Sequence, residues 1–173
     1  MLNVKHNDPN ADAARTLMIT RNDQPITILL VDDDADCRML IRDAINECKV
    51  SNDVYEVSNG QEALDFLHRR GKHANAPRPG LVYLDIEMPA MDGQTTLKAI
   101  KSAPELRDIP VVMMTGVCDE TQMKTAAANG ANSYTIKPAN AEQFLRTVLA
   151  STNYWLTIHQ YPEHHLPEDL CRR

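Results

Sequence analysis

Four short apolar runs of the sequence are typical of buried strands. Each is followed directly by a residue that could take part in chemistry: an acid, a threonine or a lysine. These runs end on Asp32 and Asp33, on Asp85, on Thr115 and on Lys137. A short apolar run bounded by turn-forming residues is typical of a strand that is covered on both faces, as in a parallel sheet. Ligands bind at the carboxyl ends of such strands, so these five residues are candidates for one functional site.

Three carboxylates in one pocket need a positive charge beside them. Two carboxylates about 4 Å apart repel each other by roughly 4 kcal/mol at an effective dielectric constant of 20. Mg²⁺ meets this need, because it prefers hard oxygen ligands from carboxylates, water and phosphate. We therefore expect Asp32 and Asp33 to hold Mg²⁺, while Lys137 supplies a second positive charge and Thr115 a hydroxyl donor for a phosphoryl group.

Asp85 is the expected nucleophile of this pocket. A carboxylate that attacks phosphorus needs neutralisation of charge more than it needs a base. Each residue alone has an ordinary structural role: Asp85 could cap a turn, Thr115 could cap the next helix, and Lys137 could be exposed to solvent. Their joint placement at four strand ends favours phosphoryl transfer.

The elements that must position these residues alternate along the chain. Strands are expected at residues 26–31, 53–57, 81–84, 111–114 and 132–136, and helices at 35–48, 60–67, 93–102, 119–129 and 140–151. Asp34 and Asn59 precede two of the helices as N-caps. Strict alternation predicts an α/β fold, a doubly wound parallel sheet with right-handed crossovers and helices on both faces. In the strand order 2-1-3-4-5 the first and third strands are neighbours, which brings the three acids together.

Composition limits the classes of function. The 173 residues allow one domain at 25–151, a polar leader at 1–24 and an extension at 152–173. A net charge of −6 argues against nucleic-acid binding, and no apolar run approaches the length of a membrane span. Four scattered cysteines without a C-x-x-C pair, and no signal-peptide pattern, favour a cytoplasmic protein with reduced thiols.

Four motifs together resemble the receiver domain of two-component response regulators, over residues 26 to about 151. They are VDD at 31–33, LDIEMPAMDG at 84–93, MTG at 114–116 and YTIKP at 134–138. The resemblance implies a flavodoxin-like (βα)5 fold and transfer of a phosphoryl group from a histidine kinase to Asp85 with Mg²⁺. It also implies that the chain catalyses its own phosphotransfer and autodephosphorylation and signals to a downstream protein.

The same resemblance assigns further residues. The backbone carbonyl of Glu87 would join the Mg²⁺ shell. Thr115 and Tyr134 would form a switch pair, in which the hydroxyl moves toward the phosphoryl group and the ring turns inward. The family also implies a cis peptide bond between Lys137 and Pro138.

Two shorter stretches are similar to a narrower group, the single-domain regulators that partner bacterial phytochromes. They are the loop HANAPRP at 73–79 and the tail NYWLTIHQYP at 153–162. This similarity implies a phytochrome-like histidine kinase as the partner.

The segment after the last predicted helix leaves two interpretations open. It is too short for a winged-helix or helix-turn-helix domain and it is not basic, so no output domain is expected. Trp155, Leu156 and Ile158 nevertheless form an apolar cluster. These side chains either fold back over the last helix or join a homodimer interface.

Two other functions compete with the receiver hypothesis. Phosphatases of the haloacid dehalogenase class also use a strand-end Asp, an acid two residues later (here Glu87), a Thr and a Lys. Their metal-binding acids follow the Lys in sequence, whereas Asp32 and Asp33 precede it. The second alternative is a receiver-like module that binds a partner without phosphorylation, although every residue needed for phosphorylation is present.

Overall fold

A five-stranded parallel sheet forms the centre of the chain. The structure, a computed structural model, describes residues 26–47 and 52–157. The strands are β1 (Thr27–Val31), β2 (Asp53–Val57), β3 (Leu81–Asp85), β4 (Val111–Thr115) and β5 (Ser133–Ile136). Their order in the sheet is β2-β1-β3-β4-β5, which confirms the doubly wound topology predicted from the sequence. The strands β1 and β3 are therefore hydrogen-bonded neighbours, with Val31 opposite Leu84.

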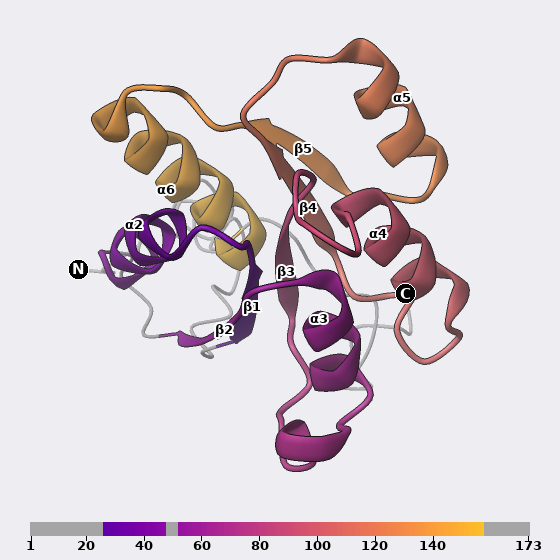
Figure 1. Cartoon of the computed structure of the whole chain (residues 1–173). Helices are drawn as coiled ribbons and strands as arrows, with labels where there is room; N and C mark the ends of the chain where they lie inside the picture. Colours follow the sequence, from indigo (N-terminus) through magenta and orange to yellow (C-terminus); the bar gives the residue numbers. More distant parts are fainter. Residues whose placement is uncertain (1–25, 48–51, 158–173) are drawn as a thin grey trace, which may run out of the picture.

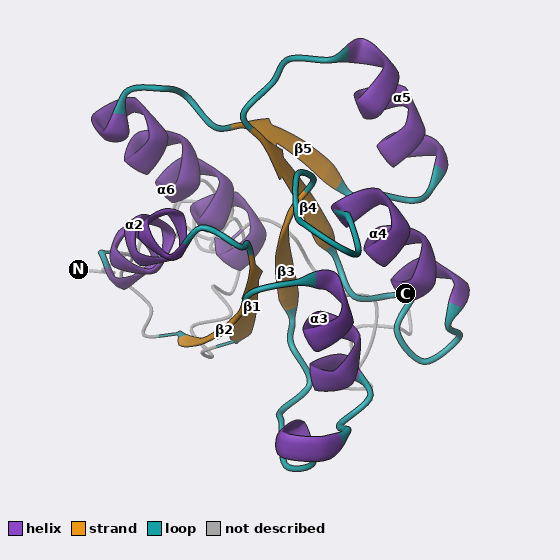
Figure 2. Cartoon of the chain, in the orientation of Figure 1, coloured by secondary structure: helices purple, strands orange, loops and turns teal. Residues whose placement is uncertain are grey.

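Helices cover both faces of this sheet, and Figure 2 shows their alternation with the strands along the chain. They are α2 (Ala35–Asn46), α3 (Gly60–Leu67), α4 (Gly93–Ser102), α5 (Glu120–Ala128) and α6 (Ala141–Thr157), with a short 3-10 turn, η1 (Gly71–His73), after α3. In Figure 1, α2 and α6 lie side by side on one face, and α3, α4 and α5 lie on the other.

Each face of the sheet has its own hydrophobic core, because successive side chains of a strand point to opposite faces. Every residue of β3 and β4 is buried, as expected for central parallel strands. The core under α3, α4 and α5 includes Leu29, Val31, Phe66, Val82, Leu84, Leu97, Ile100, Val111 and Met113. The core under α2 and α6 includes Ile28, Leu30, Ile41, Ile45, Tyr83, Val112, Phe144, Val148 and Trp155.

Local chemistry fixes the beginnings of α2, α3 and α4. The carboxylate of Asp34 accepts hydrogen bonds from the backbone N–H groups of Asp36 and Cys37, and Asn59 accepts one from Glu62, so both predicted N-caps are confirmed. At the start of α4, a Cβ atom on Gly93 would lie 2.1 Å from the carbonyl oxygen of Asp85. Only glycine permits this close approach, which holds the helix start against the end of β3.

The last helix is longer than its predicted end near Ser151, because α6 continues to Thr157. One side of its additional turn is buried: Thr152 is fully covered, and Trp155 packs in the core under α2 and α6. The hydroxyl groups of Thr152 and Tyr83 lie 2.8 Å apart and link this turn to β3. The predicted boundary between residues 151 and 152 therefore falls inside a helix.

The predicted cis bond before Pro138 is wrong, since no cis peptide occurs in residues 26–47 and 52–157. With the bond trans, the N–H of Lys137 still donates to the carbonyl of Thr115, and its side chain reaches two acids. The trans form is the ordinary preference of the peptide bond.

Some predicted segments lie outside the described residues, namely the leader at 1–24 and the tail beyond residue 157. Cys48, the predicted end of the first helix, also lies outside them, and α2 ends at Asn46. None of the helices in the described part of the chain combines the length and the apolar character needed to cross a membrane.

Candidate functional site

Three carboxylates meet where β1 and β3 end side by side. Asp32 directly follows β1, Asp33 is the next residue, and Asp85 is the last residue of β3. One carboxylate oxygen from each lies within 4.8 Å of the others. Asp32 is 2% exposed and Asp85 5% exposed, while Asp33 is open to solvent. The acids predicted from the sequence thus form one cluster with an accessible side.

Lys137 reaches this cluster from the loop after β5. Its Nζ lies 2.6 Å from Oδ2 of Asp32 and 2.8 Å from Oδ1 of Asp85. Burial alone would disfavour the ammonium ion, but the hydrogen bonds to both carboxylates outweigh burial and raise the pKa of Lys137 above its ordinary value. The side chain therefore stays charged and offsets part of the repulsion between the acids.

Burial has the opposite effect on the acid at the centre. It raises the pKa of Asp85 to about 6, although the hydrogen bond from Lys137 opposes the shift. Oδ1 of Asp85 is fully covered, and the ammonium group of Lys137 lies 2.8 Å from it. A covered carboxylate oxygen beside two further acids fits a divalent cation with oxygen ligands. Asp32, Asp33 and Asp85 are the side chains that would hold it.

Thr115 and Tyr134 lie together beyond the acids, on β4 and β5. The hydroxyl of Thr115 donates to the carbonyl of Val117 and accepts from its N–H, so it faces its own loop. The hydroxyl of Tyr134 is covered and has no hydrogen bond of good geometry. Burial raises the pKa of Tyr134, while the nearby Thr115 hydroxyl opposes this effect. The ring of Tyr134 is thus turned inward, toward Thr115.

Comparisons with known proteins agree with this geometry. Residues 28–149 match the family model described as the response regulator receiver domain. The chain belongs to this family. Rcp1, a response regulator of Synechocystis, is 30% identical over 139 residues, which cover 80% of this chain and 95% of Rcp1. The family assignment favours a signalling protein over a phosphatase of the haloacid dehalogenase class.

Two solved structures of receiver proteins resemble the fold over their full length. The phosphorylated cyanobacterial phytochrome response regulator RcpA has a TM-score of 0.78 and 34% identity, covering 81% of this chain and 100% of RcpA. The Mn²⁺-bound form of Rcp1 has a TM-score of 0.76 and 29% identity, covering 80% of this chain and 100% of that structure. Receiver domains bind a divalent metal, and the acid cluster supplies suitable ligands here.

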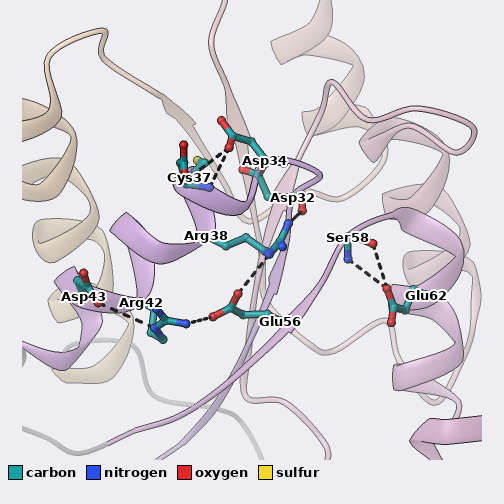
Figure 3. A network of polar contacts seen from close by, with 10 residues as sticks. Asp32, Asp34, Cys37, Arg38, Arg42, Asp43, Glu56, Ser58 and Glu62 are labelled. Atoms are coloured by element: carbon teal, nitrogen blue, oxygen red, sulfur yellow. Dashed lines mark hydrogen bonds and ion pairs between the residues drawn. The ribbon is translucent and has the colours of Figure 1, made fainter.

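The receiver site also contains contacts that the sequence did not reveal, and Figure 3 shows the one that Arg38 makes. Nη1 of Arg38, on α2, donates to the backbone carbonyl of Asp32 at 2.5 Å. Cys37, one residue earlier, is buried beside the acids, and burial together with a hydrogen bond to Asp32 raises the pKa of its thiol to about 12. The helical spacing in the sequence predicts a helix after Asp32. It does not show which side chains of that helix contact the end of β1.

The other predicted site residues have different surroundings. The side chain of Glu87 is exposed, and a Cβ atom on Gly116 would lie 3.8 Å from its Oε2, so Glu87 stands across from the loop after β4. Trp155 belongs to α6, is 5% exposed and packs in the core under α2 and α6, so it neither folds back over the last helix nor lies open for a dimer contact. The side chain of Leu156 and all of Ile158 lie outside the described residues.

Proposed function

We propose that this receiver protein accepts a phosphoryl group on Asp85 from a histidine kinase, with Mg²⁺, and that phosphorylation changes its binding to other proteins. The observation that carries the proposal is the cluster of Asp32, Asp33 and Asp85 around Lys137. The cluster provides a nucleophile, ligands for a divalent metal and a fixed positive charge at one place.

The proposed transfer is a substitution at phosphorus. An oxygen of the Asp85 carboxylate forms a bond to phosphorus, the bond between phosphorus and the donor imidazole nitrogen breaks, and its electron pair stays on that nitrogen. At neutral pH Asp85 is mostly ionised, because its pKa of about 6 lies below that pH. When bound, Mg²⁺ supplies charge neutralisation for the phosphoryl oxygens. Lys137 already lies against Asp85 and supplies a second positive charge to them.

The proposed switch uses Thr115 and Tyr134. The hydroxyl of Thr115 would leave Val117 and donate to a phosphoryl oxygen, with the inward ring of Tyr134 filling the space beside it. Tyr134 lies on β5 two residues before Ile136, which is exposed together with Val117 and Met123. A change at the switch pair would therefore act on a strand that carries an exposed apolar side chain, Ile136.

A phytochrome-like histidine kinase is the proposed partner, and the cytoplasm the proposed location. Support comes from RcpA, which is described as a phytochrome response regulator.

For the downstream step we propose a second copy of the chain, bound through the exposed side chains of Val117, Met123 and Ile136. Sedimentation of the chain with and without phosphodonor tests this, and Ile136→Glu should abolish any dimer. Truncating the chain at Asn153 would not be a clean test of dimer formation, because it would also remove Trp155 from the core.

The test of phosphorylation is the intact mass after incubation with Mg²⁺ and acetyl phosphate. We expect one added phosphoryl group, which is lost when EDTA replaces Mg²⁺ and lost in Asp85→Asn. Asp119→Asn is the matched control, because that acid caps α5 outside the cluster. No addition to the native chain would favour the alternative, a module that binds its partner without phosphorylation.

A further inference from the structure

We propose that Arg38 is a positioning residue for the metal site, because it fixes the end of β1 that carries Asp32 and Asp33. Its guanidinium group lies between two acceptors (Figure 3). Nη1 donates to the carbonyl oxygen of Asp32, and Nε donates to Oε2 of Glu56 on β2 at 3.2 Å. One planar group thus joins α2, the end of β1 and the edge strand β2.

The carbonyl of Asp32 needs such a partner because of its place in the sheet. The ladders of β1 with β2 and β3 end at Val31, so Asp32 lies one residue beyond them. Other atoms of Asp32 are also held: its N–H donates to the carbonyl of Val57, and its two carboxylate oxygens accept from Asp34 N and from Lys137 Nζ. Arg38 holds the carbonyl oxygen of Asp32 as well. This contact restrains the backbone at Asp32 and therefore the position of Asp33, the next residue.

Glu56 serves as the anchor for Arg38. Arg42, one helical turn later, donates from Nη1 to Oε1 of Glu56 at 2.7 Å, so two arginines of α2 hold both oxygens of one carboxylate. The side chains of Arg38 and Glu56 are 16% and 26% exposed, so the pair is better shielded than an ordinary surface ion pair. Groups that orient a ligand from outside its coordination shell commonly affect metal affinity about 10- to 100-fold.

Because Arg38 is positively charged, the proposal predicts a direction of change in metal affinity opposite to that expected from charge alone. A positive charge near a cation site weakens cation binding, so removing it should tighten binding if charge were its whole contribution. If Arg38 acts by holding the carbonyl of Asp32, removing the guanidinium should weaken binding instead. Arg38→Lys separates the two effects, because lysine keeps the charge but cannot offer the two divergent donors.

The inference rests on the proposed metal-dependent function and is tested by Mn²⁺ titration, with free Mn²⁺ counted by electron paramagnetic resonance. We expect Arg38→Lys and Arg38→Gln to weaken Mn²⁺ binding about 10-fold. Arg146→Gln is the matched control, because Arg146 is an exposed arginine on α6 that pairs with Glu142, outside the contacts of Arg38, Glu56 and Asp32, and the affinity of this variant should stay that of the native chain. Circular dichroism in EDTA establishes that each variant is folded.

The outcomes separate this inference from the proposed function. Failure of the native chain to bind Mn²⁺ would refute both. Native binding with unchanged affinity in Arg38→Lys, or tighter binding in Arg38→Gln, would refute only the positioning role. If the Arg38 variants do not fold, Glu56→Gln decides the question, because it loosens the anchor and leaves Arg38 in place. Weaker Mn²⁺ binding is then expected, and unchanged binding would overturn the proposal.

Discussion

The ammonium nitrogen of Lys137 lies 2.8 Å from Oδ1 of Asp85 and joins the loop after β5 to the central strand β3. The same nitrogen contacts Asp32, so one ammonium group forms ion pairs with two buried carboxylates. This arrangement makes Lys137 important for stability as well as for the proposed transfer, because two buried acids without a counter-charge repel each other.

Lys137→Met should lower the free energy of unfolding in EDTA by about 3 kcal/mol, the usual cost of removing one partner of a buried ion pair. Mg²⁺ should recover more stability in this variant than in the native chain, because it replaces the missing charge. Urea unfolding in EDTA and in Mg²⁺ measures both effects. Lys124→Met, which removes an exposed ion pair with Glu120, should change little, and equal losses in the two variants would contradict the prediction.

Magnesium affinity should rise with pH through about 6 and level off above it. The pKa of Asp85 is raised to about 6, so near that pH the carboxyl must lose a proton before it can bind a cation. Calorimetry in buffers of different ionisation enthalpy should show release of about half a proton at pH 6 and almost none at pH 8. Asp85→Asn should show no such release, whereas equal release at both pH values would exclude Asp85 as its source.

Tyr83→Phe should cost about 1 to 2 kcal/mol of stability, because it leaves a buried hydroxyl without its partner. The hydroxyl of Tyr83 lies 2.8 Å from Oγ1 of Thr152 and 3.1 Å from Oγ of Ser151, under the last turns of α6. Tyr154→Phe is the control, since Tyr154 is 49% exposed. Urea unfolding that gives the same midpoint and slope for both variants would disprove a structural role for the Tyr83 hydroxyl.

Gly93→Ala should destabilise the chain by about 1 to 3 kcal/mol, since the added methyl group would overlap the backbone of Asp85 and Ile86. Gly116→Ala is the matched control, because the nearest atom to its added Cβ would be 3.8 Å away. Thermal unfolding of the two variants measures the difference. A native-like transition in Gly93→Ala would show that α4 can move away from the end of β3 at little cost.

The residue types at the strand ends determined most of the site. Asp32, Asp33, Asp85 and Lys137 could be placed together because the alternation of strands and helices permits few topologies, and the order of a doubly wound sheet puts β1 beside β3. The N-caps at Asp34 and Asn59 were also predictable, since capping depends on residues only two or three positions apart.

Tertiary contacts decided the remaining features. The extra turn of α6 depends on the space that Trp155 fills and on Tyr83, which is distant in sequence. The surroundings of the Tyr134 hydroxyl likewise depend on a neighbour from another strand, Thr115 on β4. Arg38 is a polar position on α2, and only the packing of α2 against β1 and β2 gives its guanidinium group two acceptors. Sequence periodicity shows which face of an element is buried, whereas the partner of a polar side chain is set only when distant segments pack together.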